Sequence, residues 1–363
     1  MQSFKIRLEL NDKQKTLTLQ HAGVARHAYN WGLDTCNEAF KNKEKRPTSI
    51  DLHKKLVAEV KKKYSWYYEV SKCAPQQPLR DLDTSFQRFF KKVSKYPTFK
   101  KKGRKDSFYL EGNIEIKNNR IKLPIFGWIK LSEKIKDLKG VKNVRISRRA
   151  DFWFVSFKTE AKKEKIRYAK NSFVGVDLGI KTLATLSNGM TFENKRPYKF
   201  YKRKLKIEQR KLSKKYQKNK SKKEQSKNYS KQQKVVAQLH YKIACIREDS
   251  LHKLTTYLAK NHVRIAIEDL NVKGMSKNHK LSSAILDGGF YEFRRQLTYK
   301  CEWYGSKLVV VDRFFPSSKL CSNCGHKKEK LYLSERIYSC EKCGLRMDRD
   351  LNASVNLAKH VVS

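Results

Sequence analysis

Three acidic residues stand beside apolar runs in a chain that is otherwise strongly basic. Asp177 and Glu268 each end such a run, and Asp350 lies just before a helix-like segment at residues 352–360. A carboxylate costs several kcal/mol to bury unless it is paired or binds a metal ion. Oxygen ligands from three converging segments suit Mg²⁺, and two such ions can cleave a phosphodiester bond. The sequence therefore predicts an acidic metal site built from distant parts of the chain.

Each acidic residue also has an ordinary structural interpretation. An Asp that follows a strand often caps a turn or a helix, and Glu268 with Asp269 fits a surface turn. Two carboxylates at the ends of strand-like runs and a third at the start of a helix favour convergence at one edge of a sheet. The residues alone leave both interpretations open.

The charge balance indicates a polyanionic partner. The chain has 83 Lys and Arg against 35 Asp and Glu, a formal net charge of +48 over 363 residues. Neutralising phosphates releases counterions and strengthens binding to nucleic acid, whereas the alternative is a solvated lysine-rich surface. The length predicts two or three domains, and 39% hydrophobic residues can fill their cores.

No segment is typical of export or of a membrane. Residues 1–7 lack the apolar core of a signal peptide, and no apolar stretch approaches the about 20 residues that span a bilayer. Four of the eight cysteines are scattered, which fits a reducing compartment better than a disulfide framework; they are Cys36, Cys73, Cys245 and Cys301. We therefore expect a cytoplasmic protein with no membrane and no secretory pathway.

The other four cysteines form two Cys-x-x-Cys pairs, Cys321 with Cys324 and Cys340 with Cys343. A glycine follows each pair directly and can adopt the positive φ of a knuckle-like turn. Two thiolate pairs give tetrahedral Zn²⁺ coordination with no open position. The spacing predicts one structural zinc ion, and disulfides, a redox pair or a catalytic zinc are weaker alternatives.

The first hundred residues predict one strand and then helices. Residues 4–10 alternate apolar and charged side chains, as in a half-buried strand. Three segments with helical spacing follow; they run from about residue 24 to 40, from a possible N-cap at Ser49 to about 64, and from Pro78 to about 93.

A basic loop at residues 96–104 then opens a β-rich region. Its lysines and its aromatics Tyr96 and Phe99 suit phosphate contact and base stacking. Short strand-like runs follow at residues 108–110, 114–116, 121–123, 144–146 and 152–157. We expect a β-barrel from residues 1–10 and 96–168, with residues 11–95 as a helical insertion.

Strands alternate with helices from about residue 171, which predicts an α/β layer fold. The strand-like runs are residues 173–177, 181–186, 263–267 and 307–311, and residues 290–304 read as a helix. Residues 195–234 carry 18 Lys or Arg against Glu208 and Glu224. We expect a long basic helix or a helical hairpin there, with a mobile distal part. The aromatics Tyr198, Phe200 and Tyr201 could stack on bases or simply pack.

Together these motifs resemble a known family. The acidic segments look like the three parts of a split RuvC-like nuclease site, and the cysteine pairs lie just before the third part. The whole arrangement is similar to TnpB, the insertion-sequence-encoded relative of type V CRISPR effectors. The residues that carry the resemblance are Val176-Asp177-Leu-Gly-Ile-Lys181, Ile267-Glu268-Asp-Leu270, Asp350-x-Asn352-Ala353, Asp287-Gly-Gly-Phe290 and Phe315-Pro-Ser-Ser-Lys-x-Cys321-Ser-x-Cys324-Gly325.

The resemblance implies a fold and a set of site residues. It implies an RuvC/RNase H-like nuclease domain over residues 169–315 and 347–363, a zinc ribbon over 316–346, and an N-terminal barrel of the wedge type. Asp177, Glu268 and Asp350 would hold two Mg²⁺ ions. Asp350 is preferred over Asp348 because the family motif is Asp-x-Asn-Ala.

The resemblance also implies the partners and the reaction. They are a guide RNA and a double-stranded target DNA, cleaved beside a short adjacent motif, in the cytoplasm of a prokaryote and on its nucleoid. Alternatives are a small type V CRISPR effector and a nuclease-inactive RNA-guided DNA-binding repressor. A strand-transfer transposase is less favoured, because the chain shows no HUH or Tyr-transposase arrangement.

Overall fold

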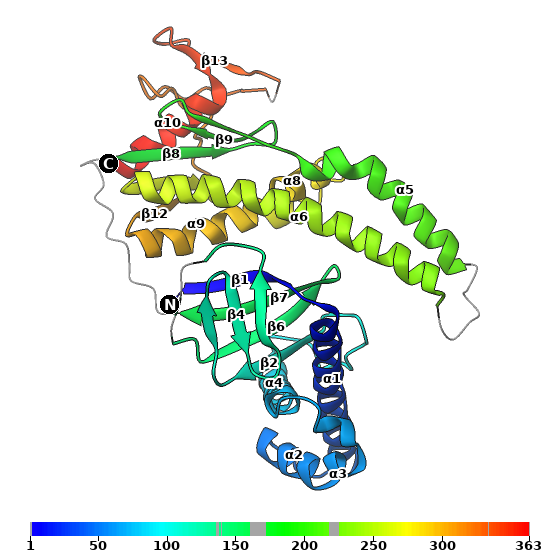
Figure 1. The fold of residues 1–363 in the computed structure, drawn as a ribbon. Helices are drawn as coiled ribbons and strands as arrows, with labels where there is room; N and C mark the ends of the chain where they lie inside the picture. Colours follow the sequence, from blue (N-terminus) through cyan, green and yellow to red (C-terminus); the bar gives the residue numbers. More distant parts are fainter. Residues whose placement is uncertain are drawn as a thin grey trace. The chain divides into compact units, whose positions relative to one another are not determined.

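The computed structural model describes residues 2–135, 138, 140–159, 172–217, 225–332 and 334–362. The chain divides into two compact units, Met1–Ala161 and Lys162–Ser363 (Figure 1). Among the described helices, none is both long enough and apolar enough to cross a lipid bilayer.

Seven antiparallel strands form the sheet of the N-terminal unit, in the order β2-β6-β7-β1-β5-β4-β3. They are β1 (Gln2–Glu9), β2 (Ser107–Glu111), β3 (Glu115–Lys117), β4 (Arg120–Leu123), β5 (Gly127–Leu131), β6 (Asn143–Arg149) and β7 (Phe152–Thr159). Both end strands contribute to one core, through Phe108 on β2 and Ile116 on β3. The sheet is therefore strongly curved.

The helices of this unit follow β1 directly. They are α1 (Asp12–Lys41), α2 (Ser49–Lys55), a π-helical turn (Leu56–Val60), α3 (Lys61–Lys63), a 3₁₀ turn (Ser65–Tyr67) and α4 (Cys73–Phe90). Their apolar faces form a core of their own. Gly32 allows α1 to approach α4 closely, because a Cβ at this position would lie 2.8 Å from Leu79.

The expected strands and helices of this unit are present, but several bounds were wrong. Helix α1 starts twelve residues before the expected position, at a capping box of Asn11 and Gln14 whose polar residues precede the apolar spacing. Thr48, not Ser49, caps α2. Strand β5 was missed because the Pro and Gly beside it read as a loop, and Gly127 indeed has a φ of +68°.

A five-stranded sheet forms the centre of the C-terminal unit, in the order β10-β9-β8-β11-β12. Its strands are β8 (Phe173–Leu178), β9 (Thr182–Leu186), β10 (Thr191–Glu193), β11 (Arg264–Glu268) and β12 (Lys307–Val311). Strands β8, β11 and β12 are parallel, whereas β9 and β10 are antiparallel to their neighbours. This is the α/β layer that the sequence predicted.

Helices cover the two faces of this sheet. The helices of this unit are α5 (Pro197–Gln217), α6 (Lys227–Asn261), α7 (Val272–Met275), α8 (Ser282–Gly288), α9 (Phe290–Tyr304) and α10 (Arg349–Val362). Helices α6, α8 and α9 pack on the face that carries Val176 and Ile267. Helix α10 packs on the opposite face, where Leu357 contacts Ala266 and Val311 (Figure 1).

The basic segment forms two packed helices, α5 and the first half of α6, which agrees with the expected hairpin. Leu205 on α5 packs against apolar residues of α6. Buried Asp287 fixes the start of α5 by accepting hydrogen bonds from the backbone N–H groups of Tyr198 and Lys199, and it pairs with Arg247 at 2.9 Å. The expected mobile tip falls on residues 218–224, which lie outside the described residues.

Candidate functional site

The alternation of side chains along the strands places two of the acidic residues on one face of the sheet. Val176 and Ile267 are register partners in neighbouring parallel strands and point into the core beneath α6 and α9. The residues that follow them, Asp177 and Glu268, therefore point to the opposite face. That is the face covered by α10.

Gly175 determines how closely α10 lies over this face. A Cβ at this glycine would lie 1.9 Å from the backbone oxygen of Ser354 and 2.5 Å from the backbone nitrogen of Ala358. Helix α10 therefore crosses β8 in contact with its backbone. Asp350 lies one turn before Ser354, in the first turn of the helix. The close crossing thus brings the third acidic residue to the strand end that carries Asp177.

The electrostatics of Asp177 reflect this convergence. The pKa of Asp177 is raised to about 7, mainly by burial and also by the negative charges of Asp350 and Glu268. Burial also raises the pKa of Glu268. The structure therefore brings Asp350 and Glu268 within electrostatic reach of Asp177. Among the described residues, the four cysteine sulfurs are the one group of possible metal ligands whose atoms all lie within 4.8 Å of one another. The carboxylate oxygens of the three acidic residues are more widely spaced.

Replacing Asp177 by Asn should stabilise the chain in magnesium-free buffer at pH 8. The pKa of Asp177 is about 7 in the folded chain against an ordinary 3.8. Ionisation of Asp177 therefore lowers the free energy of unfolding, and this loss grows as the pH rises from about 4 to 7. At about 1.4 kcal/mol per pKa unit, the penalty above pH 7 is at most about 4 kcal/mol. Urea unfolding at pH 5 and pH 8 measures it. Equal gains at both pH values would contradict the raised pKa of folded Asp177.

Asp348 has a separate role at the start of α10. Its Oδ1 accepts hydrogen bonds from the backbone N–H groups of Asp350, at 2.9 Å, and Leu351, at 3.0 Å. Asp348 therefore caps the helix. The carboxylate of Asp350 takes no part in this cap and has Arg349 Nε at 3.5 Å. The local structure thus supplies a reason, independent of any motif, to prefer Asp350 over Asp348 as a metal ligand.

The two Cys-x-x-Cys pairs come together in one cluster. The Sγ atoms of Cys321 and Cys343 are 3.5 Å apart, and those of Cys324 and Cys340 are 3.6 Å apart. A tetrahedron with zinc–sulfur bonds of about 2.3 Å places its sulfurs roughly 3.8 Å apart, whereas a disulfide requires about 2.05 Å. The cluster therefore fits one zinc ion.

The backbone around each cysteine pair repeats the same turn. Gly325 donates to the carbonyl of Cys321 and Gly344 to that of Cys340, and both glycines have the predicted positive φ, +72°. The antiparallel pair β13 (Ile337–Ser339) and β14 (Arg346–Asp348) holds the second turn. Strand β14 leads directly into α10, so the cysteine cluster adjoins the helix of Asp350. The other four cysteines are free thiols.

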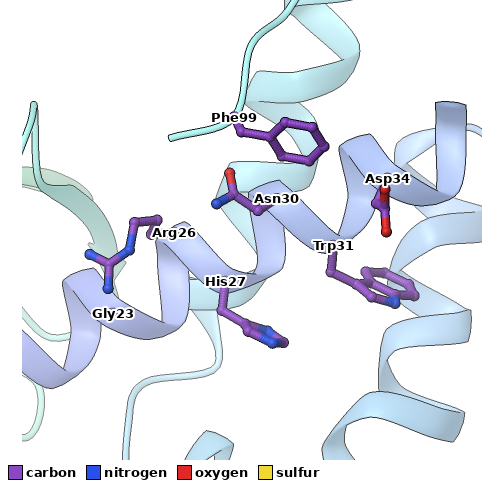
Figure 2. Close-up of a pocket in the computed structure, with 7 residues that line it drawn as sticks. All are labelled: Gly23, Arg26, His27, Asn30, Trp31, Asp34 and Phe99. Carbon is purple, nitrogen blue, oxygen red and sulfur yellow. The ribbon is translucent and has the colours of Figure 1, made fainter. Parts of the chain in front are cut away.

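A separate open pocket of about 420 Å³ lies on α1 in the N-terminal unit. Figure 2 shows its residues, Gly23, Arg26, His27, Asn30, Trp31, Asp34 and Phe99. The Asn30 amide exchanges two hydrogen bonds with the backbone of Lys100, which ties the basic loop to α1. This leaves the ring of Phe99 51% exposed at the pocket.

The aromatics singled out from the sequence divide into packed and exposed rings. Tyr96 packs edge-on against Phe86 and donates a hydrogen bond to Asn37. Tyr198 and Tyr201 pack in the core between α5 and α6. Phe99, at 51%, and Phe200, at 78%, are the most exposed of the five, ahead of Tyr96 at 43%. Those two are the better candidates for base stacking.

Three family models match parts of the chain. They are "Helix-turn-helix domain" over residues 1–45, "Probable transposase" over 156–279, and "Cas12f1-like, TNB domain" over 290–357. Within the first match, the described residues form one strand, β1, and one helix, α1, instead of two helices.

Relatives of known name extend the comparison. "TnpB-like protein L79" of Acanthamoeba polyphaga mimivirus is 36% identical over 33% of this chain and 24% of its own length. The cryo-EM structure of a Cas12f1–sgRNA–target DNA complex covers 98% of both chains at 16% identity and a TM-score of 0.37. "Putative RNA-guided DNA endonuclease InsQ" of Escherichia coli (strain K12) is 34% identical over 100% of this chain and 93% of its own length. With a relative of that identity along its whole length, the chain belongs to the TnpB family, as its motifs predicted.

Proposed function

We propose that this chain is the RNA-guided DNA endonuclease of a transposon, which cleaves DNA complementary to its guide beside a short adjacent motif. The observation that carries the proposal is the convergence of Asp177 and Glu268, on one face of the sheet, with Asp350 at the start of α10, the helix in backbone contact with β8 over that face. The name of the full-length relative supports RNA guidance and DNA cleavage.

The three carboxylates would hold two Mg²⁺ ions. They are hard oxygen ligands, and the pKa of Asp177 is raised by burial and by neighbouring negative charges that divalent cations would neutralise. When bound, such ions activate water and stabilise the departing 3′ oxygen. The three ligands lie on two strands and a helix. Because these elements are rigid, metal binding should cost little conformational entropy. No side chain has to act as a nucleophile.

The order of the C-terminal sheet supports an RuvC/RNase H-like domain over residues 169–315 and 347–363. Three successive antiparallel strands, β8 to β10, are followed by β11 and β12 parallel to the first of them. The paired turns around the cysteines support a zinc ribbon over residues 316–346, with one structural Zn²⁺.

The curved seven-stranded sheet supports the other half of the domain assignment. We assign residues 1–10 and 96–168 to a wedge-type β-barrel, and residues 11–95 to a helical insertion with its own core. In this arrangement β2 and β3, the two ends of the sheet order, are the strands between which the barrel would close.

Guide RNA and target DNA are the partners that fit the surface. Helix α5 alone carries nine Lys or Arg against Glu208, and it presents Phe200 to solvent. Such a surface binds phosphates without regard to sequence, so that base pairing with the guide supplies most of the discrimination. A nuclease-inactive repressor is less favoured, because it would have no use for three mutually repelling carboxylates.

Replacing Cys321 and Cys324 together by Ser should remove the zinc ion and unfold the ribbon. Two thiolates cannot complete the tetrahedral site, and a structural zinc site contributes its binding free energy to folding. The zinc content of the purified chain, measured by mass spectrometry, should fall from one per chain to none. Cys245→Ser is the control that should keep its zinc. Unchanged zinc content in the double variant would refute the four-cysteine site.

The proposed function is tested by purifying the chain from cells that carry its native flanking DNA and sequencing the RNA that accompanies it. One abundant RNA ending in transposon-adjacent sequence, and Mg²⁺-dependent cleavage of DNA that matches it, is the expected result. A repeat-derived RNA would favour the small CRISPR effector instead. Heterogeneous cellular RNA without guided cleavage would overturn the proposal.

A further inference from the structure

Two buried asparagines join α10 to the first cysteine turn. Asn352 is fully buried; its Oδ1 accepts a hydrogen bond from the backbone N–H of Ser322, at 2.9 Å, and its Nδ2 donates to the carbonyl of Leu320, at 2.7 Å. Ser322 follows the zinc ligand Cys321, and Leu320 precedes it. The Asn352 amide thus forms hydrogen bonds with the backbone on both sides of this zinc ligand.

Asn356 repeats the contact one helical turn later. Its Nδ2 donates to the carbonyls of Leu320, at 2.7 Å, and Ser317, at 2.8 Å. Lys359 extends the row by donating to the carbonyl of Ser322. Residues 352, 356 and 359 lie on one face of α10. Helix α10 is therefore held from two sides, by the backbone of β8 at Gly175 and by the cysteine turn.

Burying two asparagine amides costs free energy, and what the chain gains from them is a defined position for α10. A buried amide must satisfy its donors and its acceptor, and a well-packed apolar side chain would give similar burial without that demand. In return, directional hydrogen bonds define the rotation and the height of the helix, which apolar packing defines less sharply. Asp350 lies two residues before Asn352 in the same first turn. Any rotation of α10 therefore moves its carboxylate.

We propose that Asn352 and Asn356 are positioning residues that transmit the geometry of the zinc-held turn to Asp350. The zinc site then sets the spacing of Asp350 from Asp177 and Glu268, and so the affinity of the acidic site for divalent metal. This inference rests on the proposed function of the three carboxylates. It adds that the two metal sites of the chain are coupled through α10.

The test measures metal binding by the purified, zinc-loaded, full-length chain without nucleic acid. Mn²⁺, which accepts oxygen ligands as Mg²⁺ does, is titrated and followed by electron paramagnetic resonance. The acidic site is defined as the Mn²⁺ binding that Asp177→Ala removes. In Asn352→Ala this binding should weaken by about 10- to 100-fold, as for other lost partners of metal ligands. The zinc content should remain one per chain.

Two further variants separate positioning from folding. Lys342→Ala shortens an exposed side chain between the zinc ligands Cys340 and Cys343 and should leave Mn²⁺ binding unchanged. Asn356→Ala keeps both contacts of Asn352 and should weaken Mn²⁺ binding by a smaller factor. It serves as the test variant if Asn352→Ala loses its zinc. In cleavage assays, the asparagine variants should need more Mg²⁺ and recover most of their rate when it is saturating.

The outcomes distinguish the inference from the function on which it rests. If Asp177→Ala removes no Mn²⁺ binding from the unchanged chain, the acidic metal site itself is wrong. If it does remove binding, but the zinc-loaded asparagine variants bind Mn²⁺ as tightly as the unchanged chain, the coupling alone is wrong. A cleavage rate that falls equally at all Mg²⁺ concentrations would also overturn the coupling.

Discussion

Replacing Asp177 by Ala should lower Mg²⁺-dependent cleavage of the guided target by more than about 100-fold. Losing a residue that only hydrogen-bonds to a metal ligand costs up to about 100-fold, and losing the ligand itself should cost more. Asp177 is the acidic residue whose charged form is most disfavoured by its surroundings, through burial and through Asp350 and Glu268. It is therefore the carboxylate that gains most from a divalent cation. Guide-dependent binding of the target should stay near that of the unchanged chain, because this contact depends on phosphates and base pairing.

The measurement pairs a cleavage assay with a binding assay on the same guide-loaded protein. Asp348→Ser is the matched control, because a serine hydroxyl can keep the cap on α10 while the carboxylate is removed. This variant should cleave at a rate close to that of the unchanged chain. Loss of target binding in Asp177→Ala would mean that Asp177 is structural. Loss of cleavage in Asp348→Ser to the level of Asp177→Ala would assign the third ligand to Asp348.

Local patterns were sufficient to predict most of the elements that carry the site. The apolar runs before Asp177 and Glu268 are buried parallel strands, and the paired cysteine turns have the positive-φ glycines that their spacing implied. These features depend on a few neighbouring residues, which is why the sequence reports them well. The convergence of the acidic residues was predicted from strand ends and motifs, and the crossing at Gly175 supplies its physical cause.

Other features were not predicted, either because they carry no apolar pattern or because their partners lie far away in the chain. The start of α1 is set by a polar capping box, which carries no apolar period. The role of Asn356 could not be predicted, because its partners Ser317 and Leu320 precede it by 39 and 36 residues. Its spacing of four from Asn352 is the one available signal, and on a helix it shows only that the two share a face.

Replacing Gly175 by Ala should destabilise the C-terminal unit and reduce cleavage beyond what the lost stability explains. The added methyl would meet backbone atoms of Ser354 and Ala358, which cannot move aside as a flexible side chain can. Overpacking of this kind costs about 1–3 kcal/mol and occasionally more. Relief requires α10 to shift away from β8, and that shift carries Asp350 away from Asp177. We expect a lower midpoint of urea unfolding, and at least tenfold less cleavage at a temperature where the variant remains folded.

Leu258→Ala is the control that separates these two effects. Leu258 is fully buried on α6, on the face of the sheet opposite α10, and its truncation should cost about 2–5 kcal/mol. It should therefore lose at least as much stability as Gly175→Ala and yet cleave well while folded, because α10 keeps its place. The second control is the Mg²⁺ concentration. Gly175→Ala keeps all three acidic residues and only displaces one of them, so higher Mg²⁺ should restore part of its cleavage. If the two variants instead lose cleavage in proportion to their stability, the backbone contact at Gly175 supports the fold and not the spacing of the acidic site.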